Sequence, residues 1–176
     1  VVGSDVAGVA GATARSKLAA CEYGGDKAIF GFGSGYTNIS NLISNVGVVA
    51  SDTAGVGSAR GALVAAGYGG DKGIFGFGHD GSATATAITN LVSNVGVVAS
   101  DTAAVAGVQA RHYPAATEYG TDTCIVGYGE NSGNYSMTNL ISNTGVVGTD
   151  VTGVGTTRDT LTACSYGGDK GIFGFG

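Results

Sequence analysis

The chain has 176 residues, of which 34 are glycine and one is proline, and its formal net charge is −5. This length suits one domain, and 43% hydrophobic residues without a Gly-X-Y period exclude a collagen-like or disordered chain. Eight basic residues are too few for the basic patch that a nucleic-acid partner needs, and no apolar run approaches the roughly 18 residues of a membrane span, so no membrane partner is expected. No signal peptide is expected either, because no basic stretch followed by an apolar core opens the chain.

An eleven-residue motif occurs four times along the chain. It reads YGGDKAIFGFG at 23–33, YGGDKGIFGFG at 68–78 and again at 166–176, and YGTDTCIVGYG at 119–129. The last glycines of the four copies are spaced by 45, 51 and 47 residues. Periods of this length predict a propeller or a solenoid built from one repeated unit.

Each repeat is expected to contribute about four short strands, here given for the second copy. LVAAGY, from Leu63, predicts a first strand of small residues, and a turn at 68–72 leads into KGIFGFG, a second strand. Alternation along that strand places Phe75 and Phe77 on one face. TNLVS and VGVVAS predict a second hairpin that turns at 94–96. By the same pattern, Val1 begins in a fourth strand, and the last copy supplies only the first two strands.

Four antiparallel strands every 45–51 residues predict an all-β fold, namely a β-propeller of four-stranded antiparallel blades. The ring is either incomplete or completed by another chain. A β-solenoid is the alternative, although its rungs usually have shorter periods. Exposed strand edges at both ends of such an array favour self-association.

The order of these elements resembles the kelch repeat. An arginine, a strand of small residues, a turn, the Ile-Phe-Gly-Phe-Gly strand, a variable loop and two more strands ending in Asp follow each other along the whole chain. The chain is also similar to glycine-rich repeat proteins of bacteriophages and environmental microbes. The resemblance implies one kelch-like domain over 1–176, with repeats that start near Arg15, Arg60, Arg111 and Arg158.

An aspartate and an arginine recur in every repeat. We expect each Asp to pair with the next Arg and to fix the loop between one repeat and the next. The expected pairs are Asp5 with Arg15, Asp52 with Arg60, Asp101 with Arg111, and Asp150 with Arg158. The alternative is a ring of arginines on the face where, by the kelch resemblance, partners bind.

Variable loops between the second and third strands are the predicted binding sites, because loops on a rigid scaffold carry recognition. The candidate contact residues, beside the four arginines, are Tyr36, His79, Asp80, Asn131 and Tyr135.

No chemistry is predicted for the histidines and cysteines. His79 and His112 occupy unrelated repeat positions and are interpreted as solvated loop residues. Cys21 and Cys164 share one repeat position, where a buried small side chain is expected. No catalytic, metal or cofactor site is therefore predicted.

The sequence thus favours a non-enzymatic structural or interaction module, either a component of a phage particle or a cell-surface component. A carbohydrate-binding propeller is the alternative. The expected partners are another copy of the chain, another protein or a glycan, and the corresponding location is the virion or the extracellular space.

Overall fold

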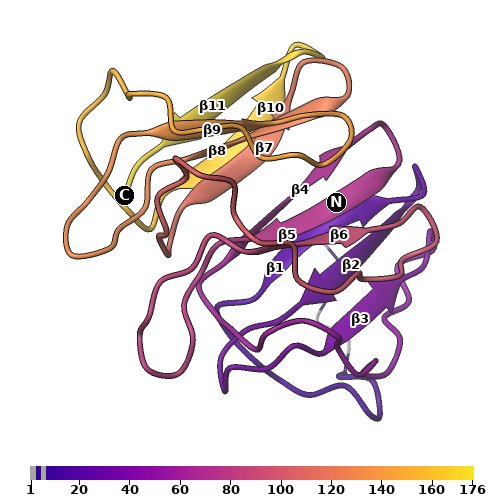
Figure 1. Ribbon diagram of the computed structural model, residues 1–176. Helices are drawn as coiled ribbons and strands as arrows, with labels where there is room; N and C mark the ends of the chain where they lie inside the picture. Colours follow the sequence, from indigo (N-terminus) through magenta and orange to yellow (C-terminus); the bar gives the residue numbers. More distant parts are fainter. Residues whose placement is uncertain (1–2, 5–6) are drawn as a thin grey trace.

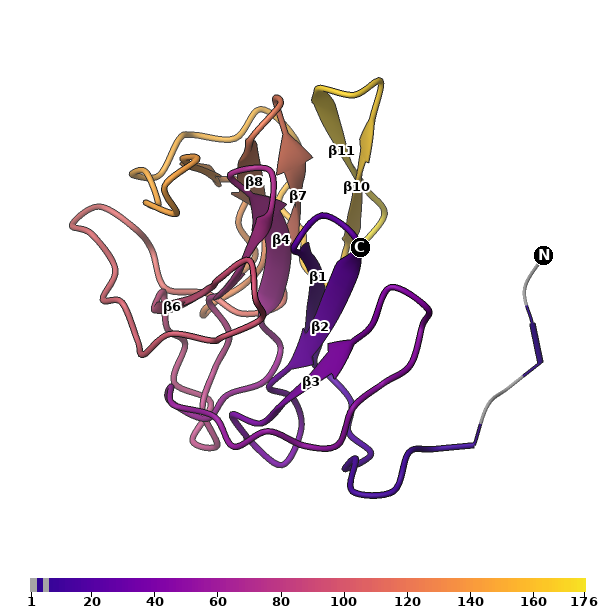
Figure 2. The ribbon, with the colours of Figure 1, turned by 90° about the vertical axis from the view of Figure 1, so that its right-hand side faces the viewer.

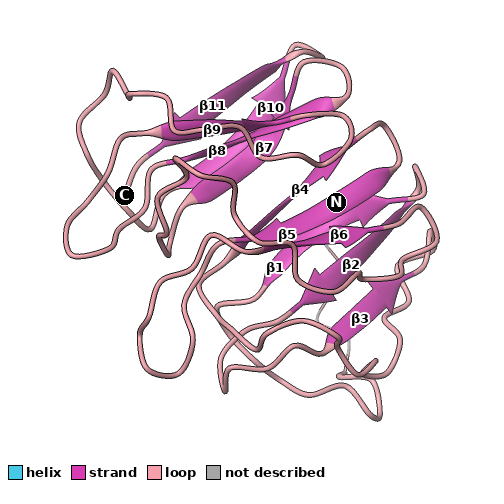
Figure 3. Cartoon of the chain, viewed as in Figure 1, coloured by secondary structure: helices cyan, strands magenta, loops and turns pink. Residues whose placement is uncertain are grey.

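The computed structural model describes residues 3–4 and 7–176, and these form strands, turns and extended loops (Figures 1 and 3). The described residues contain no helix, which confirms the all-β prediction. Accordingly, nothing in this part of the chain forms a helix that could cross a membrane. The strands make four antiparallel sheets in chain order.

The sheets are numbered here from the N-terminus. Sheet 1 contains β1 (Ala19–Tyr23), β2 (Lys27–Gly31) and β3 (Ser40–Ile43), and sheet 2 contains β4 (Val64–Tyr68), β5 (Lys72–Gly76) and β6 (Thr89–Val92). Sheet 3 contains β7 (Ala115–Tyr119), β8 (Thr123–Gly127) and β9 (Thr138–Ile141). Sheet 4 has two strands, β10 (Thr162–Tyr166) and β11 (Lys170–Gly174).

The first hairpin of each sheet forms where the repeated motif predicts it. In sheet 2, Tyr68 lies opposite Lys72 and Ala65 lies opposite Phe75. The connecting residues Gly69 and Gly70 have φ angles of 63° and 80°. L side chains rarely adopt this left-handed region, which explains the glycine pair in the turn.

A fourth segment lies beside the third strand but does not form a continuous ladder with it. In sheet 2, Val98 pairs with Val92 and Thr102 pairs with Thr89. Four steps along one segment therefore match three along the other, and this extra residue is a bulge that interrupts the ladder. The sequence prediction of four regular strands is thus only partly right. The predicted strand at Val1 lies outside the described residues.

The four sheets pack face to face in the order in which they occur along the chain (Figures 1 and 2). β1 contacts β4, β4 contacts β7, and β7 contacts β10. The first strands of neighbouring sheets are thus in direct contact. This places the smallest side chains of each repeat where the sheets approach one another.

Phe75 and Phe77 point to opposite sides of sheet 2, so their predicted common face is wrong. Phe75 packs toward sheet 1, where its ring lies 5.2 Å from the ring of Phe32 in an edge-on arrangement. Phe77 belongs instead to the cluster that contains Ile74 and Val126. The physical reason is that β5 ends at Gly76, and a φ of 63° at Phe77 breaks the alternation.

Two of the three cysteines are buried between sheets. Cys21 and Cys124 lie in the two hydrophobic clusters, and burial raises the pKa of each thiol to about 12. Cys164, expected to be buried, is exposed. The difference arises because Cys164 lies on the side of sheet 4 that no further sheet covers, whereas the equivalent side of sheet 1 is covered by sheet 2.

Candidate functional site

A buried polar network surrounds the repeated arginine of each complete sheet. In sheet 2, Arg60 is 1% exposed, and its guanidinium donates to the Phe77 carbonyl at 2.9 Å and to Asn90 Oδ1 at 2.7 Å. The amide of Asn90 in turn donates to Asp101 Oδ1 at 2.9 Å. The Asp101 carboxylate also accepts from the backbone N–H of Ser58 at 3.0 Å. Arg60 thus links the end of the second strand to the third strand directly, and to the fourth segment through Asn90.

The pairing of Asp and Arg differs from the sequence prediction. The arginines of the first three repeats approach the Asp at the end of their own repeat. The nitrogen–oxygen distances are 3.9 Å for Arg15–Asp52, 4.0 Å for Arg60–Asp101 and 3.7 Å for Arg111–Asp150. The prediction was wrong because the fourth segment returns to the start of its own sheet, where the third-strand asparagine holds the carboxylate. Arg158 donates to the Phe175 carbonyl at 3.3 Å. Asp5 lies outside the described residues.

The same arginines connect neighbouring sheets. The guanidinium carbon of Arg60 lies 4.3 Å from the ring centroid of Phe32 in sheet 1, within the range of a cation–π contact. Arg111 stacks in the same way on Phe77 at 4.4 Å, and Arg158 on Tyr128 at 5.1 Å. Burial lowers the pKa of Arg60 to about 10, and Asp101 partly opposes this shift. These contacts support a scaffold role for the arginines.

Aromatic side chains gather at one end of the array, here called the loop end. They come from the loops between second and third strands and from the segment that precedes the first strand of sheet 3. The ring of His79 lies 4.8 Å from that of His112, 5.4 Å from that of Tyr36 and 6.1 Å from that of Tyr113. His79 is 6% exposed, so its interpretation as a solvated residue is wrong. The reason is a pair of backbone hydrogen bonds between His79 and Gly61, each 3.0 Å long, which draws the loop inward.

His112 is neighboured by both acidic and basic groups. Its Nδ1 lies 3.6 Å from Glu130 Oε1. Burial lowers the pKa of His112, repulsion from His79 and Lys17 acts in the same direction, and attraction to Glu130 and Asp159 opposes it. The neutral imidazole is therefore favoured near neutral pH.

A pocket opens at the loop end where the four repeats meet. The N–H of Ala62 donates to the Lys17 carbonyl, that of Tyr113 to Ala62, and that of Thr160 to Tyr113, at 3.0, 2.9 and 3.2 Å. All four of these residues have a left-handed backbone, with φ between 52° and 54°. The pocket is completed by the residues that follow each of them, Leu18, Leu63, Pro114 and Leu161. One backbone arrangement thus presents four different side chains.

Tyr36 and Asp80, both candidate contact residues, lie in loops at this end. Tyr36 is 38% exposed and offers its ring to solvent. Asp80 accepts hydrogen bonds from the backbone N–H groups of Ser82 at 2.9 Å and Thr84 at 3.0 Å. The Ser82 hydroxyl also donates to the same carboxylate at 2.8 Å. This side-chain bond and the backbone bonds lower the pKa of Asp80 and occupy its carboxylate in shaping the loop.

Asn131 and Tyr135 are brought together in the loop of the third repeat. The Tyr135 hydroxyl donates to the Asn131 carbonyl at 2.9 Å, and the Asn131 amide donates to the Ala110 carbonyl at 3.2 Å. Both side chains therefore stabilise the loop. Of the two tyrosines that were candidate contact residues, Tyr36 is exposed and Tyr135 is only partly exposed.

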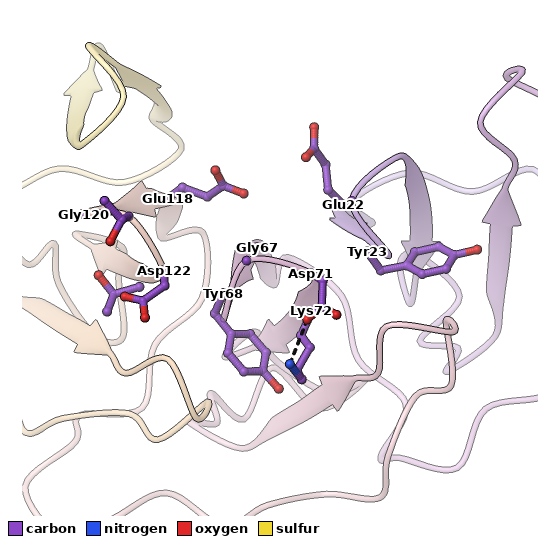
Figure 4. Close-up of a pocket in the computed structure, with 13 residues that line it drawn as sticks. Glu22, Tyr23, Gly67, Tyr68, Asp71, Lys72, Glu118, Gly120 and Asp122 are labelled. Atoms are coloured by element: carbon purple, nitrogen blue, oxygen red, sulfur yellow. Dashed lines mark hydrogen bonds and ion pairs between the residues drawn. The ribbon is translucent and has the colours of Figure 1, made fainter.

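A second pocket lies at the opposite end of the array, among the first-hairpin turns (Figure 4). Glu22 and Glu118 extend over its rim, and Lys72 forms an ion pair of 2.8 Å with Asp71. Hydrogen bonds from Lys72 and Asn94 lower the pKa of Asp71. Across residues 3–4 and 7–176, no group of three or more His, Cys, Asp or Glu side chains is placed to hold a metal ion.

Comparison with known proteins gives no family for this chain. No protein-family model matches it, and no curated protein matches it.

Proposed function

We propose that this chain is a non-enzymatic interaction module of the kelch-like propeller type, with the loop end as its contact surface. The propeller is supported by face-to-face packing of four sheets in chain order, with the first strands of neighbouring sheets in contact. The near identity of the repeats favours a component of a larger assembly, such as a virion or a cell surface.

The observation that carries the proposal is the division between repeated and variable side chains. The repeated polar residues Arg60, Asn90 and Asp101 form hydrogen bonds with one another inside the protein. Two positions in each repeat line the loop-end pocket. The first holds a different side chain in every repeat, namely Lys17, Ala62, Tyr113 and Thr160, whereas the second is leucine in three repeats and proline in one. A scaffold that is constant inside and variable at one end is typical of a protein that binds through that end.

A carbohydrate-binding module is the second candidate. It is favoured by one feature, the exposed ring of Tyr36 beside the imidazole of His79 and close to Tyr113. Aromatic rings with polar neighbours offer the apolar face and the hydrogen-bonding groups that a sugar needs.

A binding selection tests the proposal. Peptides from a random library are selected on the immobilised chain and then measured against a Tyr36→Ala, Tyr113→Ala double variant. Alanine already occupies the position equivalent to Tyr113, at Ala62, with the same backbone conformation, so this change is expected to preserve the fold. Val97→Ala, an exposed change in a turn at the other end, is the control.

We expect the selected peptides to lose about tenfold or more in affinity for the double variant and to bind the control normally, since buried tyrosines dominate interface energies. Peptides that bind both variants equally well would show that the loop end is not the contact surface. Binding on a glycan array that the double variant loses would instead support the carbohydrate candidate.

A further inference from the structure

The three interfaces between neighbouring sheets repeat one set of backbone hydrogen bonds. At the turn end, the N–H groups of Gly24, Gly69 and Gly120 donate to a carbonyl of the next sheet, with distances of 2.7, 2.7 and 2.9 Å. The acceptors are Asp71, Asp122 and Asp169. At the loop end, the N–H groups of Gly33, Gly78 and Gly129 donate to Arg60, Arg111 and Arg158, each at 3.0 Å. Each interface is therefore directional, with donors at the end of one sheet and acceptors on the next.

The side-chain packing at the interfaces follows the same direction. Phe75 of sheet 2 packs on Gly31 of sheet 1, and Phe173 of sheet 4 packs on Gly127 of sheet 3. A methyl group at Gly31 would lie 2.6 Å from Phe75 Cζ, and one at Gly127 would lie 3.0 Å from Phe173 Cζ. The glycine at the end of the second strand is thus the receptor for a ring from the following sheet.

The outer face of sheet 4 has the receptor half of this interface, and none of residues 3–4 and 7–176 packs against Gly174 there. An added Cβ at Gly174, the residue equivalent to Gly31, would meet nothing within 4 Å. Around it, Tyr166, Ile172 and Phe175 are 53%, 54% and 85% exposed. The N–H groups of Gly167 and Gly176, equivalent to the interface donors, make no hydrogen bond to any described residue.

The outer face of sheet 1 has the complementary half. Phe30, equivalent to Phe75, is half-buried, and Ala20 and Glu22 beside it are exposed. The carbonyl groups of Asp26 and Arg15, equivalent to the interface acceptors, receive no backbone hydrogen bond from any described residue. The motif at 166–176, in sheet 4, is identical to the motif at 68–78, in sheet 2. Sheet 2 packs against the following sheet of this chain, so the same residues in sheet 4 are suited to pack against a further sheet.

We propose that these two faces bind each other between two copies of the chain, with Phe30 of one copy on Gly174 of the other. The same contact made twice closes a ring of eight sheets, within the range known for propellers. A heterologous contact of this kind satisfies every face when the ring closes. A second copy is the fitting occupant because it carries both halves of an interface that the chain already forms three times. This contact uses the sheet faces and is independent of the loop end.

Substitution of Gly174 tests the contact with little risk to the fold. Gly174→Val places a side chain in open space in a single copy, but it would overpack the contact against Phe30. Ser100→Val, which adds a similar side chain at an exposed position of the fourth segment beside sheet 2, is the control. The masses are measured by native mass spectrometry and by sedimentation over a dilution series.

We expect a dimer for the parent and for the control, and a dimer dissociation constant about tenfold or more higher for Gly174→Val. Adding Phe30→Ala to Gly174→Val should recover part of the affinity, because it removes the ring that the valine displaces. A monomeric parent at high concentration, a series of longer oligomers, or a dimer that Gly174→Val leaves intact would each overturn the proposed pair. None of these results depends on the peptide or glycan measurements that test the loop end.

Discussion

Phe75 lies so close to Gly31 that a single methyl group on the glycine would sit 2.6 Å from Cζ and 2.9 Å from Cε1 of the ring. The two residues belong to neighbouring sheets, so this contact sets how closely sheets 1 and 2 approach. The Phe75 ring therefore fits against sheet 1 only because residue 31 is glycine and has no side chain.

Gly31→Ala should lower the free energy of unfolding by about 1–3 kcal/mol, since the methyl group overpacks the interface. Gly76→Ala is the matched control, because its added Cβ would meet Thr89 Cγ2 at 3.1 Å and no aromatic ring. Urea unfolding followed by circular dichroism measures both changes. An equal cost at Gly31 and Gly76 would contradict the importance of the ring.

Between sheets 2 and 3, Val126 stands where the other repeats have phenylalanine. No ring lies over the glycine at the end of β5, since a Cβ at Gly76 would meet Thr89 Cγ2 at 3.1 Å and no atom of Val126 within 4 Å. A small apolar pocket lies there, lined by Gly76, Phe77, Ala116 and Val126 among others. Val126→Phe should fill this space and raise stability by about 1 kcal/mol. In calorimetry this corresponds to an increase in Tm of about 2–4 °C.

Val97→Phe is the control for this change, since it adds a ring at an exposed turn. It should leave the Tm close to that of the parent. A lower Tm for Val126→Phe would indicate that sheets 2 and 3 have closed around the smaller side chain, and that the ring has no place between them.

Local features of this fold could be predicted from the sequence, and non-local ones could not. The turn at Gly69 and Gly70 is visible because glycine pairs with left-handed φ have a recognisable signature. The bulge opposite Thr89 has no such signature, since an extra residue in an extended segment does not change its composition. The regular fourth strand was therefore predicted where only isolated pairs form.

The polar network shows the same limit. Asp52 precedes Arg60 by only eight residues, so the sequence predicts an ion pair between them. In the structure Arg60 approaches Asp101 instead. The missing component was Asn90, which holds the carboxylate beside the arginine. Its recurrence in the Asn-Leu-Ile and Asn-Leu-Val motifs was the available signal. The contact of His79 with His112 depends on how loops of different repeats pack, and no local pattern indicates it.

Arg60→Ala should destabilise the chain much more than Lys72→Ala. Removal of Arg60 leaves buried acceptors at Phe77 and Asn90 without a donor, with an expected cost of about 1–3 kcal/mol for each buried group left unpaired. The side chain of Lys72 is 42% exposed and pairs only with its neighbour Asp71, so its loss should cost less than about 1 kcal/mol. Equal midpoints of urea unfolding would contradict the scaffold role.

His112 should make stability depend on pH in the weakly acidic range. Its pKa in the folded chain lies below the ordinary value of 6.5, mainly because of burial. The unfolded chain therefore takes up this proton first, and the stabilising contribution, complete above pH 6.5, is lost as the pH falls toward the folded pKa. Hydrogen-bonded carboxylates such as Asp71 and Asp101, whose pKa values are lowered from 3.8, titrate at lower pH and do not interfere. Urea midpoints measured between about pH 8 and about pH 5 should decline for the parent and decline less for His112→Gln, which removes the titrating group. Parallel curves for the two proteins would show that His112 takes up its proton equally well in the folded and unfolded chains.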